Sequence, residues 1–333
     1  MKFGVIYQSF DPPSVFLDYV RQIEDAGFDD LWVCDSSLHA RDVIAYLTLA
    51  AVNTNRIRLG VSVFQPFTRH PAIDVNGMLT VDEISQGRAM MAVGTGDRPQ
   101  LELGYAPAPV GLVREMIEAS RRLLGGESVT MRNDVFELHE ARARFNAPSR
   151  LPIYVACSGP RMLQMAGEVA DGVIMMCGAT TETIDYALSQ VRNGLQHASR
   201  SQDSLDVAWG AATVIADDQR EAFDETRLMA AWFANHSARY AQKVGASAEL
   251  VQAMRRQEPG RNLHEARDAA ALAPDAIVDR LTLAGPPAHI IERIQRAGAL
   301  GVNHFELFLI GRGKMRTLRR FADEVMPAFR RTA

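Results

Sequence analysis

The sequence is poor in cysteine and in lysine, and each scarcity disfavours one kind of protein. The three cysteines, Cys34, Cys157 and Cys177, are too few and too far apart for a disulfide framework, so we expect reduced thiols. Lysine occurs only three times among 36 basic residues, and none of the three lies at the end of a predicted strand. Enzymes that form a Schiff base need a suitably placed lysine, so aldolase-type chemistry is disfavoured.

Long apolar runs and an excess of positive charge are also absent. No stretch reaches the roughly 18 uninterrupted apolar residues of a membrane span, and the first apolar run is too short for a secretory signal. The net charge is −4, so no overall positive field attracts nucleic acid. We therefore expect a cytoplasmic protein that acts on a small molecule and binds neither membranes nor nucleic acid.

Short apolar segments alternate with longer amphipathic segments along the chain. This alternation predicts strand–helix–strand units and a parallel sheet. The predicted strands lie near residues 2–7, 30–34, 57–63, 88–93, 152–156, 172–176, 205–214 and 303–310. The predicted helices lie near residues 13–27, 41–53, 70–85, 109–124, 159–170, 181–198, 218–245 and 314–330.

Eight strand–helix pairs favour an α/β fold of the TIM type, one closed (β/α)8 barrel, because closure leaves no exposed parallel edge. An open dinucleotide-binding sheet needs a glycine-rich turn after its first strand, and residues 8–13 contain no glycine. We expect a single barrel domain over residues 1–333. It should carry a hairpin insertion near 126–150 and a helical insertion near 218–300 that caps one barrel mouth.

Active sites of such barrels lie at the C-terminal ends of the strands, so residues just after each predicted strand are the candidates. Asp35 follows the second strand and can orient a substrate or move a proton, with a helix cap as the alternative. Asp97 follows the fourth strand and is a second candidate for proton transfer. Arg69 and His70, after the third strand, are equally compatible with ligand contact and with a solvated helix start.

Glycine turns follow two of the strands. Gly94-Thr95-Gly96 allows the backbone to approach a flat ring or a phosphate closely, although a plain tight turn explains it as well. Residues 157–160, Cys-Ser-Gly-Pro, lead directly into a predicted helix. The first N–H groups of that helix and the Ser158 hydroxyl would form an anion-binding site, with ordinary capping by Ser158 as the alternative.

A metal site is disfavoured, because the cysteines lack paired spacing and the histidines are not clustered. No serine–histidine–aspartate arrangement is evident either. A site made of glycine turns, an anion-binding turn and few strong acids or bases suits a cofactor that brings its own reactivity.

With these motifs the chain resembles the bacterial luciferase-like superfamily, and within it the branch that depends on the deazaflavin coenzyme F420. Methylenetetrahydromethanopterin reductase is the most similar member in pattern. The matching segments run in order along nearly the whole chain, at residues 60–72, 82–88, 94–97, 158–172 and 284–287. Members that use FMN share much of this pattern.

The resemblance implies an oxidoreductase that transfers a hydride between F420 and a small organic substrate. It implies that the ring lies at the barrel mouth, with its phosphate on the turn after the fifth strand, and that the Ser62–Val63 peptide bond is cis. The cofactor-binding positions that it implies are Ser62, Val63, Gly94, Thr95, Gly96, Cys157, Ser158, Gly159 and Pro160.

The sequence departs from these relatives at two positions. Ser36 stands where many deazaflavin members have a histidine, and we include it with Asp35 among the catalytic candidates. Ile6 stands where methanopterin reductases tend to have an acid, so we do not infer a pterin substrate from the resemblance. Two other functions stay open: an FMN-dependent monooxygenase with a flavin reductase as partner, and a non-catalytic cofactor-binding barrel. We expect a homodimer.

Overall fold

The computed structural model describes residues 1–96, 98–145, 150–257 and 267–330. Eight parallel strands close into a barrel, because the last in the ring pairs with the first. In order around the ring they are β1 (Lys2–Tyr7), β2 (Asp30–Val33), β3 (Arg58–Phe64), β4 (Ala89–Val93), β7 (Ile153–Cys157), β8 (Gly172–Met175), β9 (Asp206–Ile215) and β11 (His304–Leu309). The predicted barrel and its eight strands are confirmed.

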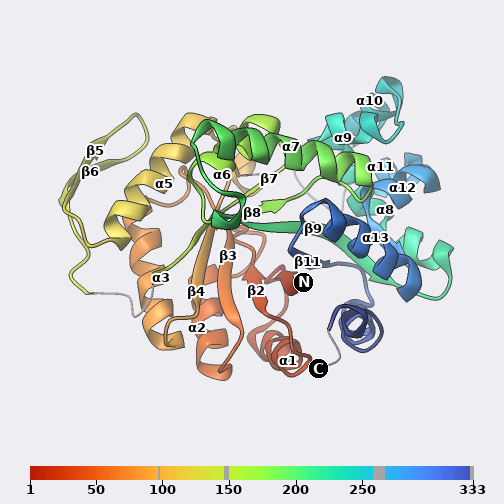
Figure 1. The fold of residues 1–333 in the computed structure, drawn as a ribbon, viewed down its shortest axis with the longest axis horizontal. Coiled ribbons are helices and arrows are strands. Elements are labelled where there is room, and N and C mark those ends of the chain that lie inside the picture. The colour runs from red at the N-terminus through yellow and green to blue at the C-terminus, as the bar shows by residue number, and fades with distance from the viewer. Residues whose placement is uncertain (97, 146–149, 258–266, 331–333) are drawn as a thin grey trace.

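Helices surround the barrel (Figure 1). They are α1 (Pro13–Asp25), α2 (Val43–Asn53), α3 (Pro71–Ser85), α4 (Arg98–Glu102), α5 (Val110–Leu124), α6 (Pro160–Val169), α7 (Thr181–His197), α13 (Pro287–Leu300) and α14 (Lys314–Arg320). Four of them, α1, α3, α6 and α13, begin with proline, whose fixed φ suits the first helical position. No helix within the described ranges is both long and apolar enough to cross a bilayer.

Both predicted insertions are present, on opposite sides of the barrel in Figure 1. The hairpin consists of β5 (Val129–Arg132) and β6 (Glu137–Ala141), which pair antiparallel. The second insertion holds α8 (Gln219–His236), α9 (Ala238–Lys243), α10 (Ala248–Gln257), α11 (Arg267–Leu272), α12 (Asp275–Leu281) and β10 (Leu283–Gly285). Near Ser237 it reaches the turn after β7, at the C-terminal mouth, as expected of a cap.

Several details differ from the sequence prediction, among them the unpredicted helix α4 and the helix α13, which was expected in the insertion and covers the barrel instead. The helix predicted over 218–245 is two helices, which meet at Ser237. The helix predicted over 314–330 ends at Arg320 and continues as a π-helical turn, Phe321–Val325, and a 3-10 turn, Met326–Phe329. Pro327 lies in that last turn and cannot donate an N–H to a continuing α-helix. The short strand β10, which pairs with β9, was not predicted.

Glycines on the inner side of the strands make room for large side chains inside the barrel. A Cβ on Gly60 would overlap the Trp32 ring, and a Cβ on Gly172 would overlap the Tyr154 ring. Both rings are almost fully buried and meet edge to face with centroids 5.0 Å apart. The barrel interior is therefore a packed core at this level, as expected of this fold.

Candidate active site

Most predicted site residues lie on one arc of the C-terminal mouth. They lie in the last residues of β2, β3, β4 and β7 or just after them, and these strands are consecutive in the sheet. The bond between Ser62 and Val63, in β3, is cis, as the resemblance implies. A Cβ on Gly94 would lie 3.0 Å from Val63 Cγ2 and 3.2 Å from the Ala156 carbonyl oxygen, so three strand ends converge at this glycine. Asp97 lies outside the described residues.

Asp35 is paired with an arginine and does not cap a helix. Its carboxylate accepts a hydrogen bond from Arg69 Nε at 3.0 Å, and its side chain is 6% exposed. Arg69 also binds Asp42 at 2.7 Å, and Asp42 is the residue that caps α2. Burial raises the pKa of Asp35, although Arg69 opposes the shift. A buried carboxyl group of raised pKa at a barrel mouth is suited to proton transfer.

The sequence analysis missed a second buried carboxyl group, that of Asp74 in the first turn of α3. It is 1% exposed, and neither oxygen has a hydrogen-bond partner among the described residues. Burial raises its pKa well above the ordinary range, with nearby Arg69 opposing and Asp35 adding to the shift. An unpaired carboxylate at this depth is costly, which favours the protonated form of Asp74. In the sequence it looks like an ordinary first-turn acid.

The other candidates of this arc take part in loop contacts. Ser36 lies in a turn where its carbonyl accepts the N–H of His39. The His39 ring lies 2.9 Å from the Glu102 carboxylate, which joins the loops after β2 and β4. His70 caps α3 through Nδ1, so the helix-start explanation holds for this residue.

The turn after β7 leaves α6 without a side-chain cap. Gly159 is the N-cap residue, while the hydroxyl groups of Ser158 and Ser237 bind each other at 3.0 Å. The capping alternative for Ser158 is therefore wrong. A Cβ on Gly159 would meet no atom within 4 Å, so the space in front of the helix is open. Such an N-terminus, with free N–H groups and open space, suits an anion.

Two arginines flank this turn. Arg161 is exposed in the first turn of α6. Arg239 is exposed in α9, next to Tyr240, whose hydroxyl donates to the Ser158 carbonyl at 2.9 Å. Their positive charge adds to that of the helix terminus.

Burial raises the pKa of all three thiols, that of Cys34 to about 12. Because the thiolate is the form that binds metals, these cysteines are poor ligands at neutral pH.

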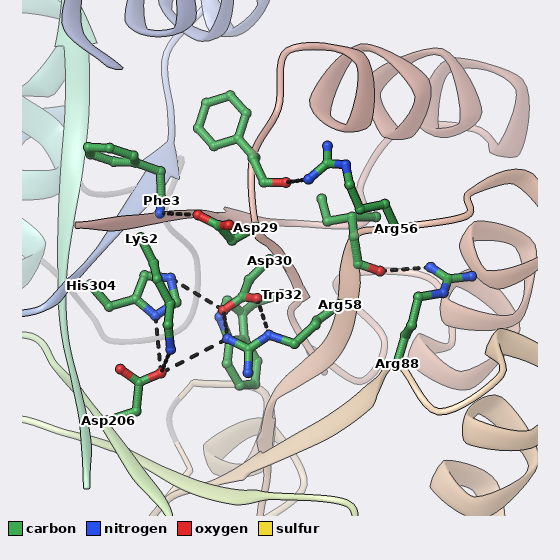
Figure 2. Close-up of polar contacts among 12 residues, drawn as sticks. Lys2, Phe3, Asp29, Asp30, Trp32, Arg56, Arg58, Arg88, Asp206 and His304 are labelled. Carbon is green, nitrogen blue, oxygen red and sulfur yellow. Dashed lines mark hydrogen bonds and ion pairs between the residues drawn. The ribbon is translucent and has the colours of Figure 1, made fainter. Parts of the chain in front are cut away.

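A second polar cluster fills the opposite, N-terminal end of the barrel, and we call it the basal network; Figure 2 shows Lys2, Asp30, Trp32, Arg58, Asp206 and His304 of it. It consists of Lys2, Asp30, Trp32, Arg58, Tyr154, Asp206, His304 and Glu306. Arg58 donates two hydrogen bonds of 2.6 Å to Asp30, which is fully buried. The His304 ring lies 3.1 Å from Glu306, 3.3 Å from Asp30 and 3.5 Å from Asp206.

A proton on His304 balances the basal network. Burial opposes charge on His304, but Glu306, Asp206 and Asp30 outweigh that effect and raise its pKa to about 9. Burial also raises the pKa of Glu306, so the two groups titrate together. Asp30, His304 and Glu306 could each offer one ligand atom to a metal ion, within 4.8 Å of one another. Since the acids of the network already lie against Lys2, Arg58 and the His304 ring, we assign the network a structural role.

Comparison with known proteins agrees with this geometry. A model of the family described as luciferase-like monooxygenase matches residues 1–304. The chain is 30% identical to 5,10-methylenetetrahydromethanopterin reductase of Archaeoglobus fulgidus, over 98% of this chain and 99% of that protein. It is 26% identical to the F420-dependent glucose-6-phosphate dehydrogenase of Intrasporangium calvum, over 96% of this chain and 95% of the other.

The solved structure of the coenzyme F420-dependent tetrahydromethanopterin reductase from Methanopyrus kandleri superposes with a TM-score of 0.89. That pair is 27% identical, and the superposition covers 99% of each chain.

Proposed function

The chain belongs to the luciferase-like monooxygenase family, and on that premise we propose that it is an F420-dependent oxidoreductase that transfers a hydride between the deazaflavin and a small organic substrate. One observation carries this proposal. Two relatives that span the whole chain are named for different substrates, tetrahydromethanopterin and glucose 6-phosphate, yet both are named as F420-dependent. Because the two relatives share the cofactor and differ in their substrates, we infer the cofactor, and neither substrate, for this chain.

When bound, the deazaflavin supplies a ring carbon that accepts or donates a hydride. We propose that residues 62–63 and 94–96 contact the ring, where three strand ends converge, and that residues 157–160 hold the phosphate. The uncapped terminus of α6, the open space at Gly159 and the flanking Arg161 and Arg239 support the second assignment.

Hydride transfer to or from a small organic molecule also needs a proton acceptor or donor. We propose Asp35 for this role, because it combines burial, a raised pKa and a place at the strand end. Ser36 and Asp97 are the further candidates for the same proton path.

Fluorescence titration with F420 and with FMN tests the proposal. We expect tight binding of F420 and weaker binding of FMN. Gly159→Asp places a negative charge in front of α6 and should weaken F420 binding at least tenfold, which is about 1.4 kcal/mol. Gly111→Asp is the matched control, because Gly111 is exposed and a Cβ there also meets open space.

Equal or reversed affinities would favour the FMN-dependent monooxygenase. Unchanged F420 affinity in folded Gly159→Asp would contradict the phosphate assignment.

We also propose that the chain acts as a single barrel domain, as a homodimer, in the cytoplasm. Val52 on α2 and Ile73 on α3 are 64% and 60% exposed, and apolar exposure on these two packed helices suits a subunit interface. The three free cysteines suit a reducing compartment. Light scattering after size-exclusion chromatography gives the oligomeric state, and a monomer at micromolar concentration would contradict the dimer.

A further inference from the structure

A buried side-chain amide lies against the glycine turn that follows β4. Gly96, in this turn, has a φ of +77°, a left-handed conformation that favours glycine. A Cβ at this position would overlap Oε1 and Cδ of Gln100, which belongs to α4. The amide of Gln100 therefore occupies the space that any larger residue at position 96 would need.

Gln100 binds the backbone on both sides of α4. Its side chain is 1% exposed, and Nε2 donates to the carbonyl oxygens of Thr95 at 3.0 Å and of Ala106 at 2.9 Å. Both hydrogens of the amide are thus used, while Oε1 has no partner among the described residues. The Thr95 carbonyl also accepts the N–H of Ala108 at 2.7 Å. Two donors therefore fix the direction of this one carbonyl group.

The segment that carries Gln100 contacts two neighbouring loops of the mouth. Glu102 lies 2.9 Å from the ring of His39, after β2. Tyr105 stacks on Phe67, after β3, with ring centroids 5.0 Å apart and planes 4° apart. The backbone on the C-terminal side of Gln100 is therefore supported from outside, which gives its side chain a fixed base.

The fixed carbonyl of Thr95 sets the direction of the next N–H group. The Thr95–Gly96 peptide bond is trans, and the C=O and N–H of a trans peptide point in opposite directions. The Gly96 N–H therefore points away from Gln100, and it has no acceptor among the residues that the structure describes. Gly94, two residues earlier, lies where three strand ends converge and where we propose that the ring binds.

From this geometry we propose that Gln100 is a positioning residue, whose amide holds the Thr95–Gly96 peptide so that the Gly96 N–H donates a hydrogen bond to a carbonyl oxygen of the cofactor ring. The proposal rests on the proposed function for the presence of a ring at this turn. A donor that is held in place before the ligand arrives loses little freedom on binding. Without the amide the peptide is free to turn, and a Thr95 carbonyl facing the ring would repel the same oxygen.

Gln100→Met tests the proposal, because it removes both hydrogen bonds and keeps a side chain of similar length. We expect F420 to bind about tenfold more weakly, the upper end of what one hydrogen bond contributes. The absorption band of bound F420 should also lie closer to that of the free cofactor. A variant that is merely less stable would bind less F420 without moving the band of the molecules that are bound. Without cofactor, amide hydrogen exchange over residues 98–108 should become faster.

Gln219→Met is the matched control, because Gln219 makes the same contacts at a glycine in the helical insertion, outside the proposed cofactor site. Its Nε2 donates to the Ala284 carbonyl at 2.7 Å, and a Cβ on Gly285, whose φ is +140°, would overlap its Oε1. We expect F420 affinity to change less than about twofold in this variant, and the band to stay where it is.

If Gln100→Met does not fold, Gln100→Glu replaces the donor group by an oxygen at nearly the same size and should cause the same loss and the same shift. A band of bound F420 that does not move in a folded Gln100 variant, or one that moves equally in Gln219→Met, would overturn the proposal. If the native protein binds FMN and not F420, the proposed function fails. The same comparison with FMN, which carries the same ring carbonyl groups, then decides the role of Gln100. A native protein that binds neither cofactor would overturn both.

Discussion

Buried acidic side chains have different hydrogen-bond partners at the two ends of the barrel. In the basal network Asp30 is fully buried and takes both of its hydrogen bonds from one guanidinium. At the C-terminal mouth Asp35 shares Arg69 with Asp42, and both oxygens of Asp74 are without partners among the described residues. Buried atoms without hydrogen bonds also occur in the basal network, on Asp206, His304 and Glu306, but these residues lie within ion-pair distance of one another. The acids of the basal network therefore lie against cationic neighbours, whereas no described residue donates a hydrogen bond to the Asp74 carboxyl group, at the mouth where we propose ligand binding.

Two aspartates only five residues apart show this contrast, because Asp30 begins β2 and Asp35 lies just after its end. Both aspartates pair with an arginine, but Arg58 gives two hydrogen bonds to Asp30, whereas Arg69 is shared between Asp35 and Asp42. The variants below test the consequences of this difference.

Arg58→Met should have the largest effect. It leaves Asp30 charged and buried without its partner, and loss of one member of such a pair costs about 3–5 kcal/mol. Arg69→Met at the mouth should cost less than half as much, because Asp35 already has a raised pKa and can take up a proton. Urea denaturation at neutral pH measures both. If both variants lose the same free energy of unfolding, Asp30 and Asp35 depend on their arginines to the same extent.

Asp35→Asn should lower turnover by about 10²–10⁴-fold, the usual worth of a general acid or base. F420 affinity should change much less, and the free energy of unfolding by less than about 1 kcal/mol. Asp30→Asn is the counterpart, expected to reduce stability and to spare turnover in the folded fraction. If Asp35→Asn lowers turnover only severalfold or less, the role of Asp35 is structural.

The basal network should also make stability depend on pH. The pKa of His304 rises from 6.5 to about 9 on folding, so the folded state holds the proton more tightly. The stability linked to this proton is complete below about pH 6.5 and is lost as the pH rises through about 9. The raised pKa of Glu306 acts in the same direction.

We expect a loss of roughly 3 kcal/mol across this range, measured as the urea midpoint at each pH. In His304→Gln the slope should become shallower. A midpoint in the native protein that does not move between pH 6 and pH 10 would contradict the assignment of the charge to His304.

The sequence was enough to predict the barrel, because buried strands and amphipathic helices leave long periodic signals. Strand β10 was missed because three residues are too few to show a period. The basal network was missed for another reason. Trp32 and Glu306 are 274 residues apart, and no spacing rule brings them together. Only the closed ring, with β11 beside β1 and β2 beyond it, makes them neighbours.

The site was predicted in part for the same reason. The strand-end rule placed Asp35 and the turn at Gly159 at the barrel mouth, where the structure has them, without any knowledge of contacts. The rule could not predict the hydrogen-bond partner of the Ser158 hydroxyl, because the Ser237 hydroxyl that binds it lies 79 residues further along the chain. The burial of Asp74 depends on how α3 packs on the barrel, which local sequence does not encode.

The smallest effect is expected from a pair of glycine-to-alanine variants, one from each level of the barrel. In Gly60→Ala the new methyl group overlaps the buried Trp32 ring, and overpacking of this kind costs about 1–3 kcal/mol. In Gly159→Ala the methyl group meets no atom within 4 Å, and φ is −73°, which alanine adopts without strain. The loss of conformational freedom in the unfolded chain should then stabilise the protein by about 0.4–1 kcal/mol. Thermal unfolding of both variants without ligand measures the difference. Destabilisation by Gly159→Ala would show that the space at the mouth is already filled by the protein itself.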